Sequence, residues 1–159
     1  MELITLLSLL SLNLFYIPYI VYINDGHPLH SISDSWYLLK SHNQEHLFTL
    51  YCFLLCIGLV FLTSLHPLFF FSGTCFAFVG VSTEFKDTKW ITDEIHYISA
   101  LIGIVSSLIG LWIITSPLPL IIFIIGSLLI YYFKKESNTH IFWIELLAIT
   151  LILWTLFLS

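Results

Sequence analysis

The sequence predicts an all-α, polytopic membrane protein with six transmembrane helices. Of its 159 residues, 58% are hydrophobic and 9% are charged, whereas soluble domains carry about 25% charged residues. The mean hydropathy of +0.98 leaves too few polar side chains to cover a surface in water. Five lysines and no arginine also argue against binding to a phosphate backbone. These observations exclude a water-soluble enzyme and a nucleic-acid-binding protein.

Six apolar segments are long enough to cross a bilayer, which takes about 17 to 25 helical residues. They lie near residues 3–22, 47–65, 67–83, 96–115, 117–133 and 140–158. Proline removes a backbone donor and ends a helix, so His66-Pro67 and Ser116-Pro117 predict tight turns between neighbouring spans. The whole chain, 1–159, is predicted to form a single transmembrane domain.

The lysines predict how the protein is oriented in the membrane. Lys40 lies in the first connection, Lys86 and Lys89 in the third, and Lys134 and Lys135 in the fifth. In a six-span arrangement all five are on one side, which the positive-inside rule makes cytoplasmic. Both termini are then outside, and the expected location is a cell membrane such as a bacterial inner membrane. The predicted cytoplasmic connections are 23–46, 84–95 and 134–139.

Small residues predict which spans pack closely. They recur near four-residue spacing in spans three and four, at Gly73, Ala77, Gly80, Ser99, Gly103 and Ser107. Small side chains at this spacing let helix backbones approach closely in lipid. Spans three and four are therefore predicted at the bundle centre, and span five is predicted to face lipid.

Histidines and acidic residues gather on the predicted cytoplasmic side. Six of the seven histidines lie there, namely His27, His30, His42, His46, His96 and His140. Neutral imidazole and carboxylate are the usual ligands of zinc, so residues from several helix ends could converge on one metal site. The alternative is that these residues lie in connections because polar groups cannot enter lipid.

The first cluster with possible chemistry is Ser31-Ile32-Ser33-Asp34-Ser35-Trp36-Tyr37. As structure alone, Ser31 and Asp34 form a capping-box pattern that opens a short helix at the membrane interface. As a functional site, the segment offers two hydroxyls and a carboxylate that could orient water or bind a polar headgroup.

The second cluster is His42-Asn43-Gln44-Glu45-His46. Ser41 and Gln44 form another capping-box pattern, which predicts that span two begins here. One helical turn would then place His42 and His46 on one face with Glu45 beside them. The string matches the motif of inverted zinc proteases, but it is short and occurs often by chance.

Two acidic positions in or beside the spans complete the candidates. Asp93 and His96 share a helix face at the start of span four, although acidic residues there also complement the helix dipole. Glu145 lies inside span six, where an ionisable side chain indicates a functional site facing the bundle interior. Alternatively, it lies shallowly, about 7 Å below His140, and reaches interfacial water.

Three motifs together resemble a known family. They are Ser31-Ile32-Ser33 with Trp36-Tyr37, then Phe78-Val79-Gly80-Val81-Ser82-Thr83, then Ile95-His96-Tyr97-Ile98-Ser99-Ala100. In this order, over residues 26–115, they resemble an uncharacterised bacterial family of small six-span membrane proteins with a Ser-Ile-Ser-x-Tyr-Tyr motif. This chain differs in that Asp34-Ser35 precede Trp36-Tyr37.

The chain is also remotely similar to the superfamily of alkaline ceramidases and progestin/adiponectin receptors. Those proteins hold zinc with histidines beside a serine and an aspartate near the cytoplasmic leaflet, and they hydrolyse lipid amides. The resemblance implies such roles for Ser33, Asp34 and His96. The superfamily's pair of histidines in the last span is reduced here to His140.

The leading functional hypothesis is a metal-dependent hydrolase acting on a lipid-like substrate at the cytoplasmic leaflet. Its zinc ligands would be His96, His140 and either His42 or His46. Asp34 or Glu145 would be the general base, and Ser33 would position the water or stabilise an oxyanion. The alternative is a non-catalytic membrane protein: a scaffold, a subunit of a complex or, less favoured, a small transporter. Membrane lipids are the expected partners.

Overall fold

The fold is that of a computed structural model, which describes residues 2–82 and 91–158. The side chains of Glu2, of residues 91–94 and of Lys135 are not described. Lys86 and Lys89 therefore lie outside the described residues, as do the side chains of Asp93 and Glu94.

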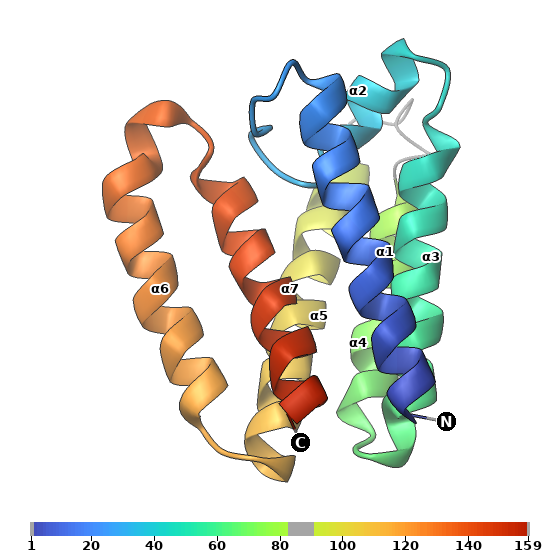
Figure 1. Cartoon of the computed structure of the whole chain (residues 1–159), viewed down its shortest axis with the longest axis vertical. Coiled ribbons are helices and arrows are strands. Elements are labelled where there is room, and N and C mark those ends of the chain that lie inside the picture. Colours follow the sequence, from blue (N-terminus) through green and yellow to red (C-terminus); the bar gives the residue numbers. More distant parts are fainter. Residues whose placement is uncertain (1, 83–90, 159) are drawn as a thin grey trace.

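The described residues form six long helices and one short helix, without strands (Figure 1). The long helices are α1 (Glu2–Ile23), α3 (His46–Phe61), α4 (Leu68–Ser82), α5 (Ile91–Ile114), α6 (Leu118–Lys134) and α7 (His140–Leu158). The short helix α2 spans Ser35–Ser41. Each predicted apolar segment corresponds to one long helix, and the all-α class is confirmed. The largest difference is that α5 begins at Ile91 rather than near residue 96.

Four helical segments among the described residues are long and apolar enough to cross a membrane. They are Leu3–Ile23, His46–Ser64, Ile95–Ile114 and His140–Leu158. The other two long helices, α4 and α6, are apolar but have 15 and 17 residues. At 1.5 Å per residue, α4 is about 22 Å long, shorter than a bilayer core of roughly 30 Å. The apolar helices indicate a membrane-embedded protein, and the six-span count stays a prediction.

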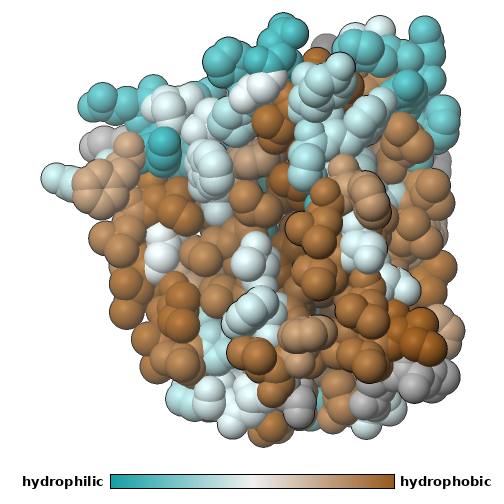
Figure 2. Space-filling view, viewed as in Figure 1, coloured by the Kyte–Doolittle hydropathy of each residue, from teal (hydrophilic) through white to brown (hydrophobic). Residues whose placement is uncertain are grey.

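The surface divides into an apolar flank and a polar end. Figure 2 shows hydrophobic side chains over the length of the helices and hydrophilic ones gathered at one end. That end carries α2 and the α6–α7 connection, whereas the chain ends lie at the opposite end (Figure 1). Large apolar side chains on the flank are well exposed, including Phe15 at 78% and Leu128 at 66%. Such an extensive apolar surface is typical of contact with lipid.

The small residues of α4 and α5 lie at close helix contacts, as predicted. The Ser72 hydroxyl donates to the Gly103 carbonyl at 2.7 Å and also bonds to Ser107. A Cβ atom added at Gly73 would lie 2.8 Å from the Cys56 carbonyl oxygen of α3. Helix α4 therefore presents one close face to α3 and another to α5.

Two predictions about packing have different outcomes. Helices α4 and α5 pack against each other, and both also expose large apolar side chains such as Phe71 and Leu101, so their place at the bundle centre stays a prediction. Helix α6 is exposed as predicted, since Pro119 is the one buried residue over its described length. It packs against α7, where Leu147 approaches Gly126.

The prediction of a helical turn over residues 42–46 is wrong. Helix α2 ends at Ser41, His42 is its C-cap, and Asn43 takes a left-handed conformation with φ of 56°. Because α3 begins only at His46, the two histidines are not on one helix face. The Ser41–Gln44 capping box is also not formed, since the Ser41 hydroxyl donates to the Leu38 carbonyl and the Gln44 side chain accepts from Tyr19.

Candidate functional site

Ser33, His96 and Glu145 line one small cavity near the polar end of the bundle. Ser33 comes from the α1–α2 connection, His96 from the first part of α5, and Glu145 from the second turn of α7. The rest of the wall is mostly apolar and comes from α3, α4, α5 and α7. The cavity has a volume of about 40 Å³. The cavity therefore has room for a few water molecules.

Glu145 is fixed by a bond to the α1–α2 connection. Its Oε2 atom accepts the backbone N–H of Ile32 at 2.6 Å. An N–H donor to a carboxylate is among the stronger hydrogen bonds in proteins. The carboxylate therefore lies in the wall of the cavity between the helices, which agrees with the alternative in which Glu145 faces the bundle interior.

Ser82 of α4 holds the ring of His96. The Nδ1 atom of His96 is 3.0 Å from the Ser82 hydroxyl oxygen, and the same hydroxyl is 2.9 Å from the Val79 carbonyl oxygen. When the hydroxyl gives its single hydrogen to that carbonyl, Nδ1 donates to Ser82, and Nε2 of the neutral ring carries the lone pair. His96 is 8% exposed, which leaves little contact with bulk solvent.

A tight turn holds Ser33 at the cavity. The Ser31 and Ser33 hydroxyl oxygens are 2.8 Å apart, and Ser31 Oγ accepts the backbone N–H of Asp34 at 3.1 Å. The predicted capping box is not formed, because α2 begins at Ser35 with Asp34, not Ser31, as its N-cap. The turn directs the Ile32 N–H to Glu145, and Ser33, the residue that follows Ile32, lines the cavity.

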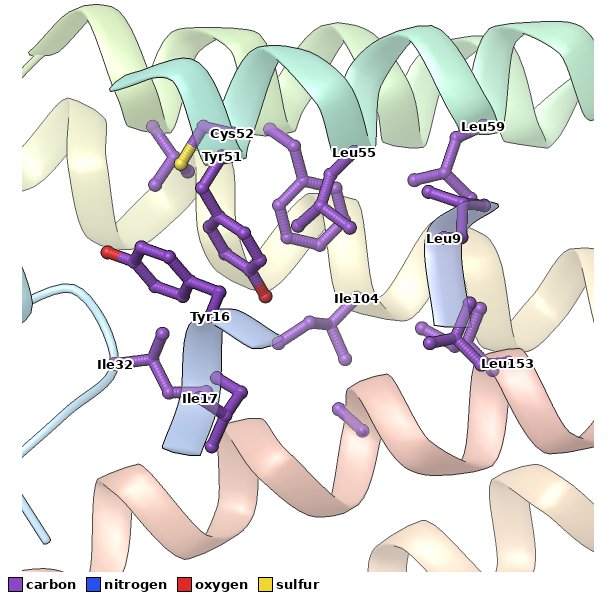
Figure 3. Close-up of a cluster of buried hydrophobic side chains, with 14 of the residues drawn as sticks. Leu9, Tyr16, Ile17, Ile32, Tyr51, Cys52, Leu55, Leu59, Ile104 and Leu153 are labelled. Atoms are coloured by element: carbon purple, nitrogen blue, oxygen red, sulfur yellow. The ribbon is translucent and has the colours of Figure 1, made fainter. Parts of the chain in front are cut away.

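A second polar cluster, not predicted from the sequence, lies against the same cavity. The rings of Tyr16 and Tyr51 stack with centroids 4.0 Å apart, as Figure 3 shows between α1 and α3. The Tyr16 hydroxyl bonds to Ser35 Oγ at 2.6 Å, and the Tyr51 hydroxyl donates to Asn13 Oδ1 at 2.6 Å. Tyr51 also lines the cavity. Of the cluster's members, only Ser35 lies in a segment that the sequence singled out. The pair of Tyr51 and Asn13 joins residues 38 positions apart, so no local pattern predicts it.

The other predicted site residues do not line the cavity. His42 and His46 are exposed at the ends of α2 and α3. His140 packs its ring against those of His30 and Tyr131, with centroids 5.9 and 5.5 Å apart. Asp34 is the N-cap of α2 and does not line the cavity.

The donor set of the described residues does not fit the predicted zinc site. Zinc sites use at least three protein ligands from histidine, cysteine and carboxylates. Within residues 2–82 and 91–158, as far as side chains are described, no group of three such residues could hold a metal ion. His96, Glu145 and Cys52 all line the cavity, but these three do not form such a group.

The chemistry that this arrangement supports is proton transfer at a small, water-sized space. A carboxylate and an imidazole line the same cavity with a hydroxyl, and apolar walls surround them. An ionisable side chain in a span usually marks a functional site. Comparison of the chain with known proteins found no matching family model, no matching curated protein and no matching solved structure.

Proposed function

We propose that this chain is a six-span integral membrane protein that hydrolyses a lipid-like ester or amide at the leaflet beside α2. The observation that carries the proposal is the shared cavity of Glu145, His96 and Ser33, which has room for water. Glu145 is the general base, His96 the general acid and Ser33 a hydroxyl that positions the water or the carbonyl oxygen. A remote relationship to the alkaline ceramidase superfamily is part of the same proposal, since Ser33 and His96 belong to the resembling motifs.

The reaction needs only water and the substrate. The Glu145 carboxylate accepts a proton from water while the water oxygen bonds to the carbonyl carbon of the substrate. Protonated His96 gives the Nε2 proton to the leaving nitrogen or oxygen as its bond to that carbon breaks. The products are a carboxylic acid and an amine or alcohol. Transfer of the proton from Glu145 to His96 then restores both groups.

The proposal is tested with the full chain in phosphatidylcholine nanodiscs. The probes are a dodecanoyl amide and a dodecanoyl ester of a fluorogenic leaving group. We expect wild-type protein to release the fluorophore from at least one probe well above the rate in empty nanodiscs. Equal rates with and without protein, for both probes, would remove the hydrolase proposal.

Metal removal separates this proposal from the zinc hydrolase predicted from the sequence. Because no three histidine, cysteine or acidic side chains among the described residues form a group that could hold zinc, we expect turnover to survive dialysis against a strong chelator within about twofold. Turnover that is lost with the chelator and returns with zinc would contradict the metal-independent route and favour the zinc site.

A non-catalytic role is the second candidate, and one contact favours it. The bond from the Ile32 amide to Glu145 ties the α1–α2 connection to α7. In a non-catalytic protein, Glu145→Leu should loosen residues 24–34, which would be measured as faster amide exchange at Ile32. Such a protein would not hydrolyse either probe, so wild type and variants alike would show no turnover.

The six-span topology is tested at the two ends of α6, one of the two apolar helices that are shorter than the four segments long enough to cross a membrane. In a chain with its native cysteines replaced by alanine, we expect Ser137→Cys to react with a membrane-impermeant thiol reagent only from the cytoplasmic side. Ser116→Cys should react only from outside. Reaction of both from one side would contradict a membrane-crossing α6, and reversed sides would contradict the predicted orientation.

A further inference from the structure

A groove on the apolar flank runs between α1 and α7. Its volume is about 240 Å³, and Leu14 and Pro18 of α1 face Thr150 and Trp154 of α7 across it. Leu14 and Trp154 are 62% and 61% exposed, so the groove is open to the surroundings of the flank. In a membrane-embedded protein those surroundings are lipid chains.

The groove adjoins the cavity that holds Glu145. Ile149 of α7 lines both spaces and forms part of the wall between them. A second connection passes through Asn13, which lines the groove and accepts the hydroxyl hydrogen of Tyr51, a residue of the cavity wall. An occupant of the groove would therefore lie one side chain away from the proposed reacting groups.

The groove is not uniformly apolar. Asn13 and Thr150 contribute polar side chains to its lining. Pro18 lacks an N–H and so cannot bond to the Leu14 carbonyl as other helical residues would. Leu14 and Pro18 both line the groove and belong to the second half of α1, the half nearer to the polar end of the molecule. An acyl chain that carries a carbonyl-linked polar group is the kind of occupant that such a lining suits.

We infer that the α1–α7 groove binds the single acyl chain of an amphiphile, with its carbonyl group at Ile149 and directed to the Glu145 cavity. This inference rests on the proposed function, for which it names the substrate class. The cavity of about 40 Å³ cannot admit a chain, whereas the groove of about 240 Å³ can. The groove is smaller than the roughly 300–1,000 Å³ of most ligand sites, which favours one chain over two.

The inference is tested by photolabelling the full chain in phosphatidylcholine nanodiscs. The probe is a dodecanoyl amide with a diazirine in its chain, and the labelled peptides are identified by mass spectrometry. We expect most label on the facing parts of α1 and α7, around Leu14, Thr150 and Trp154. An excess of the unlabelled amide should remove at least four fifths of that label.

Two variants fill the groove from opposite walls, and a third variant, outside the groove, is the control. Thr150→Trp and Leu14→Trp should each reduce the label at least fivefold, and the use of both keeps the test valid if one variant fails to fold. Ile122→Trp adds the same side chain to α6, which is exposed and outside the groove. We expect this control to label like wild type.

The outcomes separate the groove from the hydrolysis. Label spread equally over α5, α6 and the groove helices, and not reduced by the competitor, would mean ordinary surrounding lipid and overturn the inference. Crosslinking of the groove to a second copy of the chain in place of the probe would also overturn it. Competed groove labelling in a protein without turnover supports the binding site and rejects only the hydrolase. Turnover without groove labelling rejects only the groove.

Discussion

Glu145→Gln is expected to lower the hydrolysis rate of the dodecanoyl probes by at least 100-fold. The amide has the shape of the carboxylate, and its oxygen can still accept the Ile32 N–H that Glu145 accepts at 2.6 Å. It cannot take a proton from water, and a positioned general base contributes about 10² to 10⁴ in rate. The measurement is the initial rate in nanodiscs, with the free energy of unfolding measured beside it.

The matched control for this variant is Glu136→Gln. Glu136 is an exposed carboxylate in the α6–α7 connection and does not line the cavity. The Glu136→Gln protein should hydrolyse the dodecanoyl probes at the wild-type rate. Both variants should unfold within about 1 kcal/mol of wild type, the range of a benign substitution. A Glu145→Gln protein that is stable and fully active would show that Glu145 is not the base.

Glu145→Leu tests the second role of the same side chain. Removal of a carboxylate from a span gains up to a few kcal/mol on insertion scales. The loss of the bond leaves the Ile32 N–H without its acceptor, which costs about 1 to 3 kcal/mol. Because these effects are similar and opposite, global stability is a poor measure, and amide exchange at Ile32 is the direct readout.

Gly73→Leu is expected to destabilise the bundle by about 3 kcal/mol, at the upper end of the usual cost of overpacking. A Cβ atom at Gly73 would lie 2.8 Å from the Cys56 carbonyl oxygen and 3.1 Å from Val60 Cγ2, both on α3. A backbone atom cannot turn aside as a flexible side chain can, so α3 and α4 would have to separate. The measurement is unfolding in mixed detergent micelles.

Thr74→Leu is the matched control, because it introduces the same leucine side chain at the next position of α4. The Thr74 hydroxyl bonds only within its own helix among the described contacts, to the Phe70 carbonyl at 2.9 Å. We expect a change within about 0.5 kcal/mol, as for most substitutions away from the core. Equal stability of the two variants would contradict the close approach of α3 and α4.

The helices and their ends could be predicted from the sequence because hydropathy, length and proline act locally. Helix α7 spans the predicted residues 140–158, and α4 and α6 begin one residue after their prolines. The local failure was the segment 42–46, where short polar motifs suited a helix. There a left-handed Asn43 and the bond between Tyr19 and Gln44, residues 25 positions apart, determine the path of the chain.

The candidate site was predictable only in part. Glu145 and His96 could be singled out, since an ionisable or imidazole side chain in an apolar helix is unusual whatever surrounds it. Their partners could not, because the bond from Ile32 to Glu145 joins residues 113 positions apart, and Tyr51 has no distinguishing pattern.

The sequence by itself determined an all-helical, membrane-embedded chain with small residues at close helix contacts. Only the tertiary structure decided which helices those contacts join: Gly73 and Gly80 of α4 meet α3, whereas Gly103 of α5 meets α4. It also decided that His96 and Glu145 line one cavity while His42, His46 and His140 lie elsewhere. The physical reason is that periodicity places a residue on a face of its own helix, but the neighbour of that face depends on how all the helices pack.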